Sequence, residues 1–152
     1  MAGVIATATS GEVSTGTSPK TVFQLGADAN HRVIVWQWSI TFKGTSHDAA
    51  PVLVEVIGQS TTGSMTLVTP AKHDPTVDEV IQTAARRNAT TEPFGAVFRA
   101  AFTVHPRTGY TWTMPPEFDD TFMIRGATPR FLGWRVTAAE NVVCVVSATF
   151  EE

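Results

Sequence analysis

The segment His31–Lys43, HRVIVWQWSITFK, decides the fold that we predict for this chain. Apolar side chains recur at every second position, which is the period of a β-strand with one buried face. The residues expected on that face are Ile34, Trp36, Trp38, Ile40 and Phe42. Two indoles on one face can each bury about 150–250 Å². The strand is therefore expected to line a core that a second sheet covers.

Length and composition favour a single folded domain without affinity for nucleic acid. The chain has 152 residues, of which 43% are hydrophobic and only 16% are charged, and this is enough apolar material for one well-buried core. The net charge is −3 and the sequence pI is about 5.8. Because the 11 Lys and Arg residues are scattered rather than gathered in a basic stripe, a phosphate-binding surface is not predicted.

Neither an oxidising compartment nor a membrane is indicated. The single cysteine, Cys144, has no partner for an internal disulfide and lies in the apolar run NVVCVVSATF, where we expect a small buried side chain. The first 20 residues lack the basic start and continuous apolar core of a signal peptide. No run approaches the ~18 apolar residues of a membrane span. We therefore expect a protein that is made soluble and stays in the cytoplasm of the cell that makes it.

Residues 1–19 are expected to form a flexible N-terminal arm. They are rich in Ser, Thr, Gly and Ala, and Val4, Ile5 and Val13 are isolated among them, so the segment has few large side chains with which to pack a core. Two alternatives remain open: a mobile terminus, or an extension that becomes ordered on a neighbouring subunit. In the second case these three apolar residues are the candidate interface contacts.

The rest of the chain has the pattern of short strands separated by turns. Lys20–Leu25 and the segment 31–43, joined by the turn GADAN, suggest a hairpin. In the segment 96–104, alternation places Phe98 and Phe102 on one face. The further strands are expected at 52–58, 65–69, 96–104, 110–114, 121–126, 130–138 and 142–150.

The segment 71–93 fits two structures. Asp74–Pro75 resembles a helix N-cap followed by proline at the first helical position. The apolar residues that follow have helical spacing: Val77, Val80, Ile81, Ala84 and Ala85. The stretch from Ile81 to Ala85 also alternates in the manner of an extended chain. A short helix is the favoured interpretation, and a partly extended excursion is the alternative.

These elements together predict an all-β fold, an antiparallel β-sandwich or jelly-roll-like structure with at most one short helix. We assign residues 20–152 to one sandwich domain that follows the arm at 1–19. A parallel α/β sheet is excluded because the sequence has no repeated helical segments between the strands.

The sequence shows no catalytic, metal or cofactor signature. The pairs His47–Asp48 and His73–Asp74 are adjacent residues, which point to opposite faces of an extended chain and chelate poorly. No G-x-S-x-G turn presents a nucleophile, and no glycine-rich loop is spaced to hold phosphate. We therefore predict that the protein is not an enzyme and needs no metal or cofactor.

The loop PPEFDD supplies the one group of acids that resembles a glycosidase pair. Glu117, Asp119 and Asp120 lie close together there, after two prolines. A solvated turn explains them better than a catalytic role, because acids beside prolines are common in exposed turns.

The aromatic residues offer an alternative function in glycan binding. Trp36, Trp38 and Trp134 lie on the apolar faces of their strands and are expected in the core. Trp112, between two threonines and close to two prolines, is expected nearer the surface. With Tyr110 and Phe118 it is the candidate glycan contact.

Five short motifs resemble those of small all-β virion proteins encoded by tailed bacteriophages. They are ANHRV (29–33), FKGTS (42–46), ATTEP (89–93), HPRTGY (105–110) and FEE (150–152). The similarity extends over most of residues 20–152. The motifs are turns and strand ends, so no functional residue is carried across with them.

Within that group the chain looks most like a capsid decoration, or cement, protein. The resemblance implies a structural protein of the virion that binds the outer capsid surface as a homo-oligomer, expected to be a trimer. It would clamp neighbouring copies of the major capsid protein, and its weak contacts would add through effective concentration. A carbohydrate-binding or host-adhesion module of a phage tail or capsid is the alternative function.

Overall fold

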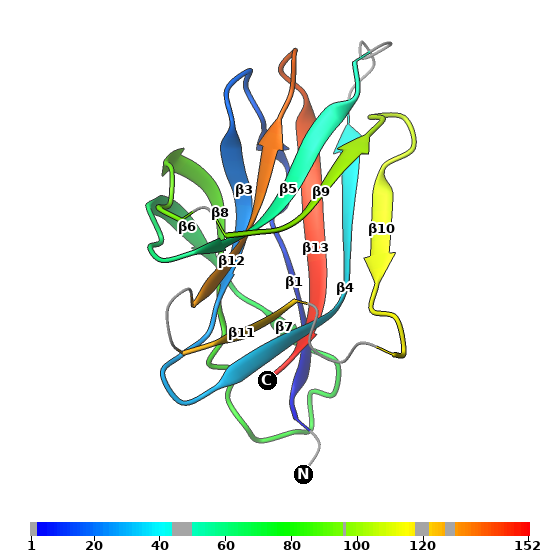
Figure 1. The fold of residues 1–152 in the computed structure, drawn as a ribbon. Helices are drawn as coiled ribbons and strands as arrows, with labels where there is room; N and C mark the ends of the chain where they lie inside the picture. The colour runs from blue at the N-terminus through cyan, green and yellow to red at the C-terminus, as the bar shows by residue number, and fades with distance from the viewer. Residues whose placement is uncertain (1–2, 44–49, 96, 118–121, 127–129) are drawn as a thin grey trace.

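The protein is a sandwich of two antiparallel β-sheets (Figure 1). The computed structural model describes residues 3–43, 50–95, 97–117, 122–126 and 130–152. Within these ranges seven strands form one sheet and six form the other, and no helix occurs. The predicted all-β antiparallel sandwich is confirmed.

The seven-stranded sheet contains strands from both ends of the chain. Its hydrogen-bonded order is β10-β4-β13-β1-β7, with β11 also paired to β4 and β2 also paired to β13. The bounds are Ile5–Thr9 (β1), Val13–Ser14 (β2), Arg32–Lys43 (β4), Ala71–Lys72 (β7), Tyr110–Thr113 (β10), Met123–Arg125 (β11) and Val143–Glu151 (β13). β4 is paired on both sides within this sheet, and the other sheet packs on its inner face, which explains why that face is apolar.

The six-stranded sheet covers the inner face of the first. Its order is β6-β8-β3-β12-β5-β9, so β6 and β9 are the two edges. The bounds are Lys20–Gly26 (β3), Val52–Gln59 (β5), Ser64–Val68 (β6), Ala84–Thr91 (β8), Val97–Val104 (β9) and Phe131–Thr137 (β12). The strands expected from the sequence after residue 20 match their observed bounds to within two residues, because period-2 patterns mark strand positions well. β7 and β8 are not among the expected strands, since they lie in the segment 71–93, for which a short helix is the favoured interpretation.

Aromatic rings fill the core between the sheets. Trp38 of β4 and Trp134 of β12 are fully buried and meet across the layers, with ring centroids 6.1 Å apart. Phe23 packs on Trp134 at 5.3 Å, and Phe102 and Tyr110 pack on Trp38 at 5.8 and 5.5 Å. Each such tilted ring pair adds about 0.5–1.5 kcal/mol beyond the area that it buries. The core positions predicted for the two tryptophans are confirmed.

The predicted hairpin between β3 and β4 is wrong. β3 pairs with β8 and β12, whereas β4 pairs with β10, β11 and β13 in the other sheet. The turn between them carries the chain from one sheet to the other. Turn residues predict a reversal of the chain, but they do not decide whether the flanking strands bond to each other or face each other across a core.

The prediction of a flexible arm is also wrong for the residues that the structure describes. β1 pairs with β13 over its whole length, from Ile5 opposite Glu151 to Thr9 opposite Ser147. Inward-facing Val4, Ala6 and Ala8 are at most 5% exposed. A ladder of backbone hydrogen bonds holds the strand in place, so it does not need large side chains. The sandwich therefore begins before residue 20.

The helix expected after Asp74 is replaced by a turn and extended chain. The Asp74 carboxylate accepts hydrogen bonds from the Thr76 hydroxyl and N–H, at 2.6 and 2.9 Å, and these bonds lower the pKa of Asp74. Farther on, the N–H groups of Gln82 and Thr83 each donate to the Glu152 carboxylate at 2.7 Å. The helical interpretation is wrong because a carboxylate from the C-terminal end satisfies these donors in an extended conformation.

One residue of the predicted core face is turned outward by a β-bulge. Thr149 of β13 pairs with Gln37 and Phe150 pairs with Val35, so Trp36 is an extra residue in β4. Trp36 is 40% exposed. A bulge moves the inward-and-outward alternation by one position. The core position predicted for Trp36 is therefore wrong, while Trp38 beyond the bulge stays inside.

Candidate functional site

The three residues predicted as interface contacts separate in the structure. Val4 and Val13 are 5% and 2% exposed and belong to the buried core of their own chain. Ile5 lies on the outer face of β1 and is 43% exposed. Val4 and Val13 therefore cannot reach a partner without unfolding the edge of the sandwich, and of the three only Ile5 is available on the surface.

The residues predicted as a glycan contact face the core. Tyr110 and Trp112 are partly buried against it. The Tyr110 ring stacks on Phe102 at 4.7 Å, and the Trp112 ring meets Phe122 edge-on at 4.6 Å. Phe118 lies outside the described residues. Ring contacts within the chain thus occupy aromatic surface on which a sugar would have to stack.

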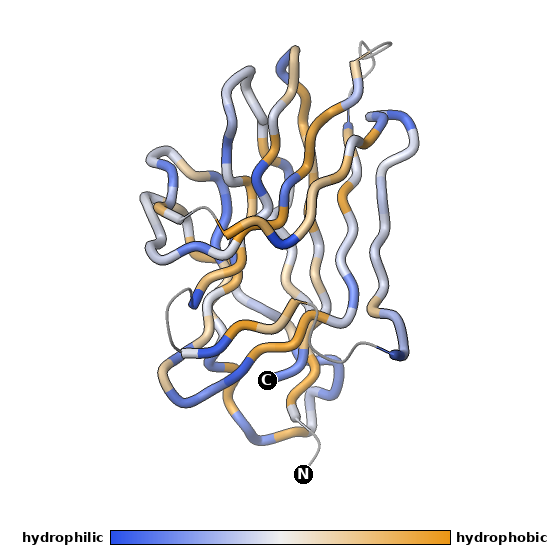
Figure 2. The backbone as a smooth tube through the Cα atoms, in the orientation of Figure 1, coloured by the Kyte–Doolittle hydropathy of each residue, from blue (hydrophilic) through white to orange (hydrophobic). Residues whose placement is uncertain are grey.

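A group of exposed apolar residues, which sequence reasoning placed inside or left unassigned, lies at the start of β9. Phe94, Val97 and Phe98, here named the β9 patch, are 77%, 52% and 56% exposed. Figure 2 shows hydrophobic residues at the start of β9, which is an edge strand of the six-stranded sheet. The segment EPFGAVF contained the signal, because it places three large apolar residues beside a turn.

A second β-bulge explains why Phe98 faces outward. Val56 pairs with Ala100 and Ile57 pairs with Phe98, so Arg99 is the extra residue in β9. Phe102, on the far side of the bulge, keeps its contact with the core. The prediction that Phe98 and Phe102 share a face is therefore wrong.

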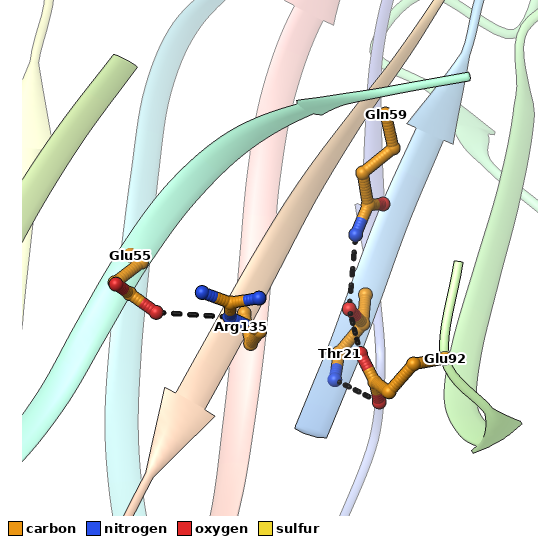
Figure 3. Close-up of polar contacts among 5 residues, drawn as sticks. All are labelled: Thr21, Glu55, Gln59, Glu92 and Arg135. Carbon is orange, nitrogen blue, oxygen red and sulfur yellow. Dashed lines mark hydrogen bonds and ion pairs between the residues drawn. The ribbon is translucent and has the colours of Figure 1, made fainter. Parts of the chain in front are cut away.

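The outer face beside Phe98 is fixed by an ion pair. The Nε of Arg135 donates to Glu55 Oε2 at 2.9 Å, and the side chains of Arg135 and Glu55 are 26% and 13% exposed (Figure 3). The same guanidinium lies 5.6 Å from the centre of the Phe98 ring, within the range of a cation–π contact. Phe98 is thus an exposed ring held on the outer face of the sheet, while Val97, the preceding residue of β9, points to the opposite face.

A buried polar network lies farther across the same outer face (Figure 3). Gln24 donates to Gln59 at 2.8 Å, and Gln59 donates to the hydroxyl of Thr21 at 3.0 Å. The hydroxyl and N–H of Thr21 donate to the two oxygens of Glu92 at 2.8 and 2.7 Å. These bonds join strands β3 and β5 to the segment after β8. The network holds that segment against the sheet, and within the described residues the amide oxygen of Gln24 is the member of it that lacks a hydrogen-bond partner.

Gly133 leaves the space that the network needs. A Cβ built on Gly133 would lie 2.2 Å from the amide oxygen of Gln59, a distance that no real contact allows. Any side chain at this position would therefore push the Gln59 amide away from its partners.

A third feature is centred on Trp36, whose side chain lies close to residues near both ends of the chain. Its Nε1 donates to Glu151 Oε2 at 3.0 Å, and the other oxygen of Glu151 accepts the N–H of Gly3 at 3.2 Å. Next to this pair is a recess of about 210 Å³, which Trp36 itself does not line. It is lined by Gly3, Arg32, Ile34, Glu151 and Glu152.

Titratable groups in the described residues offer little for reaction chemistry. No three His, Cys, Asp or Glu side chains among them are placed to hold a metal ion. Burial raises the pKa of Cys144 to about 12, so its thiol stays protonated and unreactive. His73 donates to or accepts from the Thr7 hydroxyl at 2.7 Å at the surface. His47, Asp48, Asp119 and Asp120 lie outside the described residues.

Comparisons with known proteins add no relative. No protein-family model matches the chain, and neither does any curated protein or solved structure. In the part of the chain that the structure describes, no helix could span a membrane. The functional argument therefore depends on the chain itself.

Proposed function

We propose that this chain is a structural, non-enzymatic virion protein, a capsid decoration protein of a tailed phage. It would bind the outer capsid surface as an oligomer, expected to be a trimer, and stabilise the shell through contacts with the major capsid protein. Two things support the proposal: the resemblance of the turn motifs to such proteins, and the exposed apolar edge of the sandwich.

The β9 patch is the observation that carries the proposal. Its three apolar side chains are each more than half exposed, and they lie on or just before an edge strand with no neighbour on one side among the described residues. Natural proteins usually protect such an edge with lysine, proline or a short strand. β9 has eight residues, and only Arg99 is charged. An edge of this kind is suited to contact with another protein.

The rigidity of this surface suits a protein that binds in many copies. Phe98 is fixed by the bulge and by Arg135, which is itself held by Glu55. A surface that is ordered before binding loses little conformational entropy on contact. Several copies in one oligomer then add their individual contacts through effective concentration.

Binding through the β9 patch differs from binding through an N-terminal arm that becomes ordered on a neighbouring subunit. Val4 and Val13 are already used inside the chain, so the contact with the shell is assigned to the β9 patch instead. The alternative function, glycan binding through Tyr110 and Trp112, has weaker support because both rings pack against the core.

Binding to undecorated shells of the phage that encodes the chain tests the proposal. Wild-type protein should co-sediment with the shells and raise their melting temperature. Phe98→Asp should fold normally, because Phe98 is exposed, and should lower the occupancy at least about tenfold by placing a charge in an apolar contact.

Leu67→Asp is the matched control. Leu67 is 67% exposed on β6, at the opposite edge of the same sheet, so its variant should bind as wild type does. Wild-type protein that does not co-sediment would contradict the decoration function. Equal loss in both variants would contradict the assignment of the contact to β9.

A further inference from the structure

Two arginine side chains meet on the outer face of the six-stranded sheet, at a place that the decoration function does not use. Arg86 of β8 and Arg130, the residue before β12, both contact the ring of Phe131. Their guanidinium carbons lie 5.7 and 5.1 Å from the centre of that ring, which are cation–π distances. A guanidinium that stacks on a ring with its face keeps its N–H edge for hydrogen bonds. The pair is therefore a local positive charge with donors to offer.

The register of the sheet brings these side chains together. Gly26 of β3 lies between Phe131 of β12 and Ala84 of β8 in one row of paired residues. A Cβ built on Gly26 would lie 2.7 Å from two carbons of the Phe131 ring, so the glycine lets the ring lie across β3. Ala85 packs in the core, and its neighbour Arg86 consequently points to the outer face, as Ala84 does.

A recess of about 130 Å³ lies beside the two guanidiniums. Its charged lining residues are Arg86, Arg130 and Asp28, and the Phe131 ring is one of its apolar walls. The volume is well below the roughly 300 Å³ at which pockets for drug-sized ligands begin. The recess therefore has room for one small chemical group rather than for a large ligand.

The charge of Arg86 is not compensated within the described residues. Its Nη1 is buried there without a hydrogen-bond partner, and no carboxylate of the described chain forms an ion pair with Arg86 or Arg130. Burial lowers the pKa of Arg86, and the like charge of Arg130 lowers it further. A partly buried cation without an opposite charge is costly. A bound anion would remove that cost.

The balance of charges favours a carboxylate as the anion. Arg86 and Arg130 bring two positive charges to the recess and Asp28 brings one negative charge, so a single negative charge neutralises the site. A phosphate dianion would leave an excess of negative charge beside Asp28. The two oxygens of a carboxylate also match the N–H edge of a guanidinium.

We infer that this recess binds a carboxylate group through Arg86 and Arg130. The group belongs either to a free organic acid or to an acidic side chain of another protein, because the recess recognises the chemistry that both share. This inference is independent of the proposed decoration function.

Titration of the full-length protein with carboxylates at constant ionic strength tests the inference. The backbone amide signals of Gly26 and Ala84 are followed by NMR. Acetate represents a free organic acid, and N-acetylglutamate N-methylamide represents an acidic side chain. At least one of them should shift both signals in a saturable way, and the one that binds more tightly identifies the source of the group. Inorganic phosphate should bind more weakly than that carboxylate.

Charge variants test which residues bind the carboxylate. Arg86→Gln and Arg130→Gln should each weaken binding about tenfold, because each removes a charge-assisted hydrogen bond. Asp28→Asn should tighten binding about threefold, because it removes a negative charge from the lining. A purely structural role of the two arginines predicts no such gain. Arg99→Gln is the matched control, since it removes the same charge from an exposed position of β9 and should bind as wild type does.

Melting temperatures show whether each variant is folded. If Arg86→Gln does not fold, the variants of Arg130 and Asp28 decide, because both residues are exposed. The inference is overturned if neither carboxylate shifts the two signals, or if phosphate binds more tightly than both. It is also overturned if Arg99→Gln weakens binding as much as Arg130→Gln, since the binding would then depend only on overall charge.

Discussion

Two β-bulges turn an aromatic side chain out of the sandwich, one in each sheet, and they leave the two rings in different surroundings. Trp36 is the extra residue of β4, a strand with neighbours on both sides. Phe98 adjoins the extra residue Arg99 in β9, a strand at the edge. The indole has a hydrogen bond to Glu151, whereas the Phe98 ring has the guanidinium of Arg135 beside it.

This difference teaches what each position is suited for. In a central strand the neighbouring ladders fix the bulged residue, so its side chain and the polar groups around it keep a defined geometry. At an edge the backbone on one side is still free to pair, so the apolar ring is part of a surface that another protein can extend. A β-bulge therefore leaves its outward side chain among fixed polar groups in a central strand and beside an unpaired backbone at an edge.

The largest effect on stability is expected from removing the N-terminal strand, β1. Deleting residues 1–12 removes β1, which pairs with one side of β13. It also removes Gly3, whose N–H donates to the Glu151 carboxylate that accepts the Trp36 Nε1–H. We expect the truncated chain to lose its cooperative thermal unfolding transition, because the buried side of β13 becomes exposed. Differential scanning calorimetry measures this. Ile5→Ala, at an exposed position, should keep the transition, and a truncated chain that melts as wild type does would restore the interpretation of residues 1–19 as an arm.

β1 is not predictable from the local sequence, for a physical reason. The pattern of Val4, Ala6 and Ala8 against Ile5, Thr7 and Thr9 was present, but small side chains carry little hydrophobic signal. The stability of β1 comes mainly from its pairing with β13, at the other end of the chain. Long-range pairing of this kind leaves no local mark in the sequence.

The rest of the fold was more readable. Period-2 runs predicted the strands after residue 20 other than β7 and β8, and the burial of Trp38 and Trp134, because the alternation within each run indicates which face is buried. The bulges were not predictable, since one inserted residue moves the alternation without changing composition. The two outward rings depend on those bulges, which is why Trp36 and Phe98 were expected in the core.

Among the single substitutions, replacing Trp38 best tests the contrast between a buried ring and an exposed ring in the same strand. It lies two positions from Trp36 but is fully buried, with ring contacts to Trp134, Phe102 and Tyr110. Trp38→Ala should lower the free energy of unfolding by about 3–5 kcal/mol, because it leaves a cavity between the sheets. Urea denaturation measures the loss. A change as small as that for Trp36→Ala would contradict the position of the bulge.

Cys144, in β13 next to β4, tests whether water is excluded from the core side of the seven-stranded sheet. Its thiol has a pKa raised from 9.0 to about 12 by burial. Between those values the unfolded chain loses the proton and the folded chain keeps it. Stability should therefore fall as the pH rises above about 9, by at most about 1.4 kcal/mol per pH unit. Below pH 9 this group contributes no pH dependence.

Comparison with Cys144→Ala isolates this effect from the other groups that titrate at high pH. Urea denaturation of both proteins between pH 8 and pH 11 is the measurement, and the wild type should lose more stability than the variant over this interval. Parallel curves would mean that the thiol reaches water in the folded protein and that the inner face is open there.

The smallest effects on stability are expected from the two outward rings themselves. Phe98→Ala removes a cation–π contact worth about 0.5–1 kcal/mol, and Trp36→Ala removes one hydrogen bond worth about 0.5–1.5 kcal/mol. Because the residues lie in different sheets, the double variant should equal the sum of the single ones within about 0.5 kcal/mol. Urea denaturation measures all three. Phe98→Ala should also weaken binding to the shell, whereas Trp36→Ala should leave that binding unchanged. If Trp36→Ala lost the shell as well, the two surfaces would be one site, and the distinction between a central and an edge bulge would not hold.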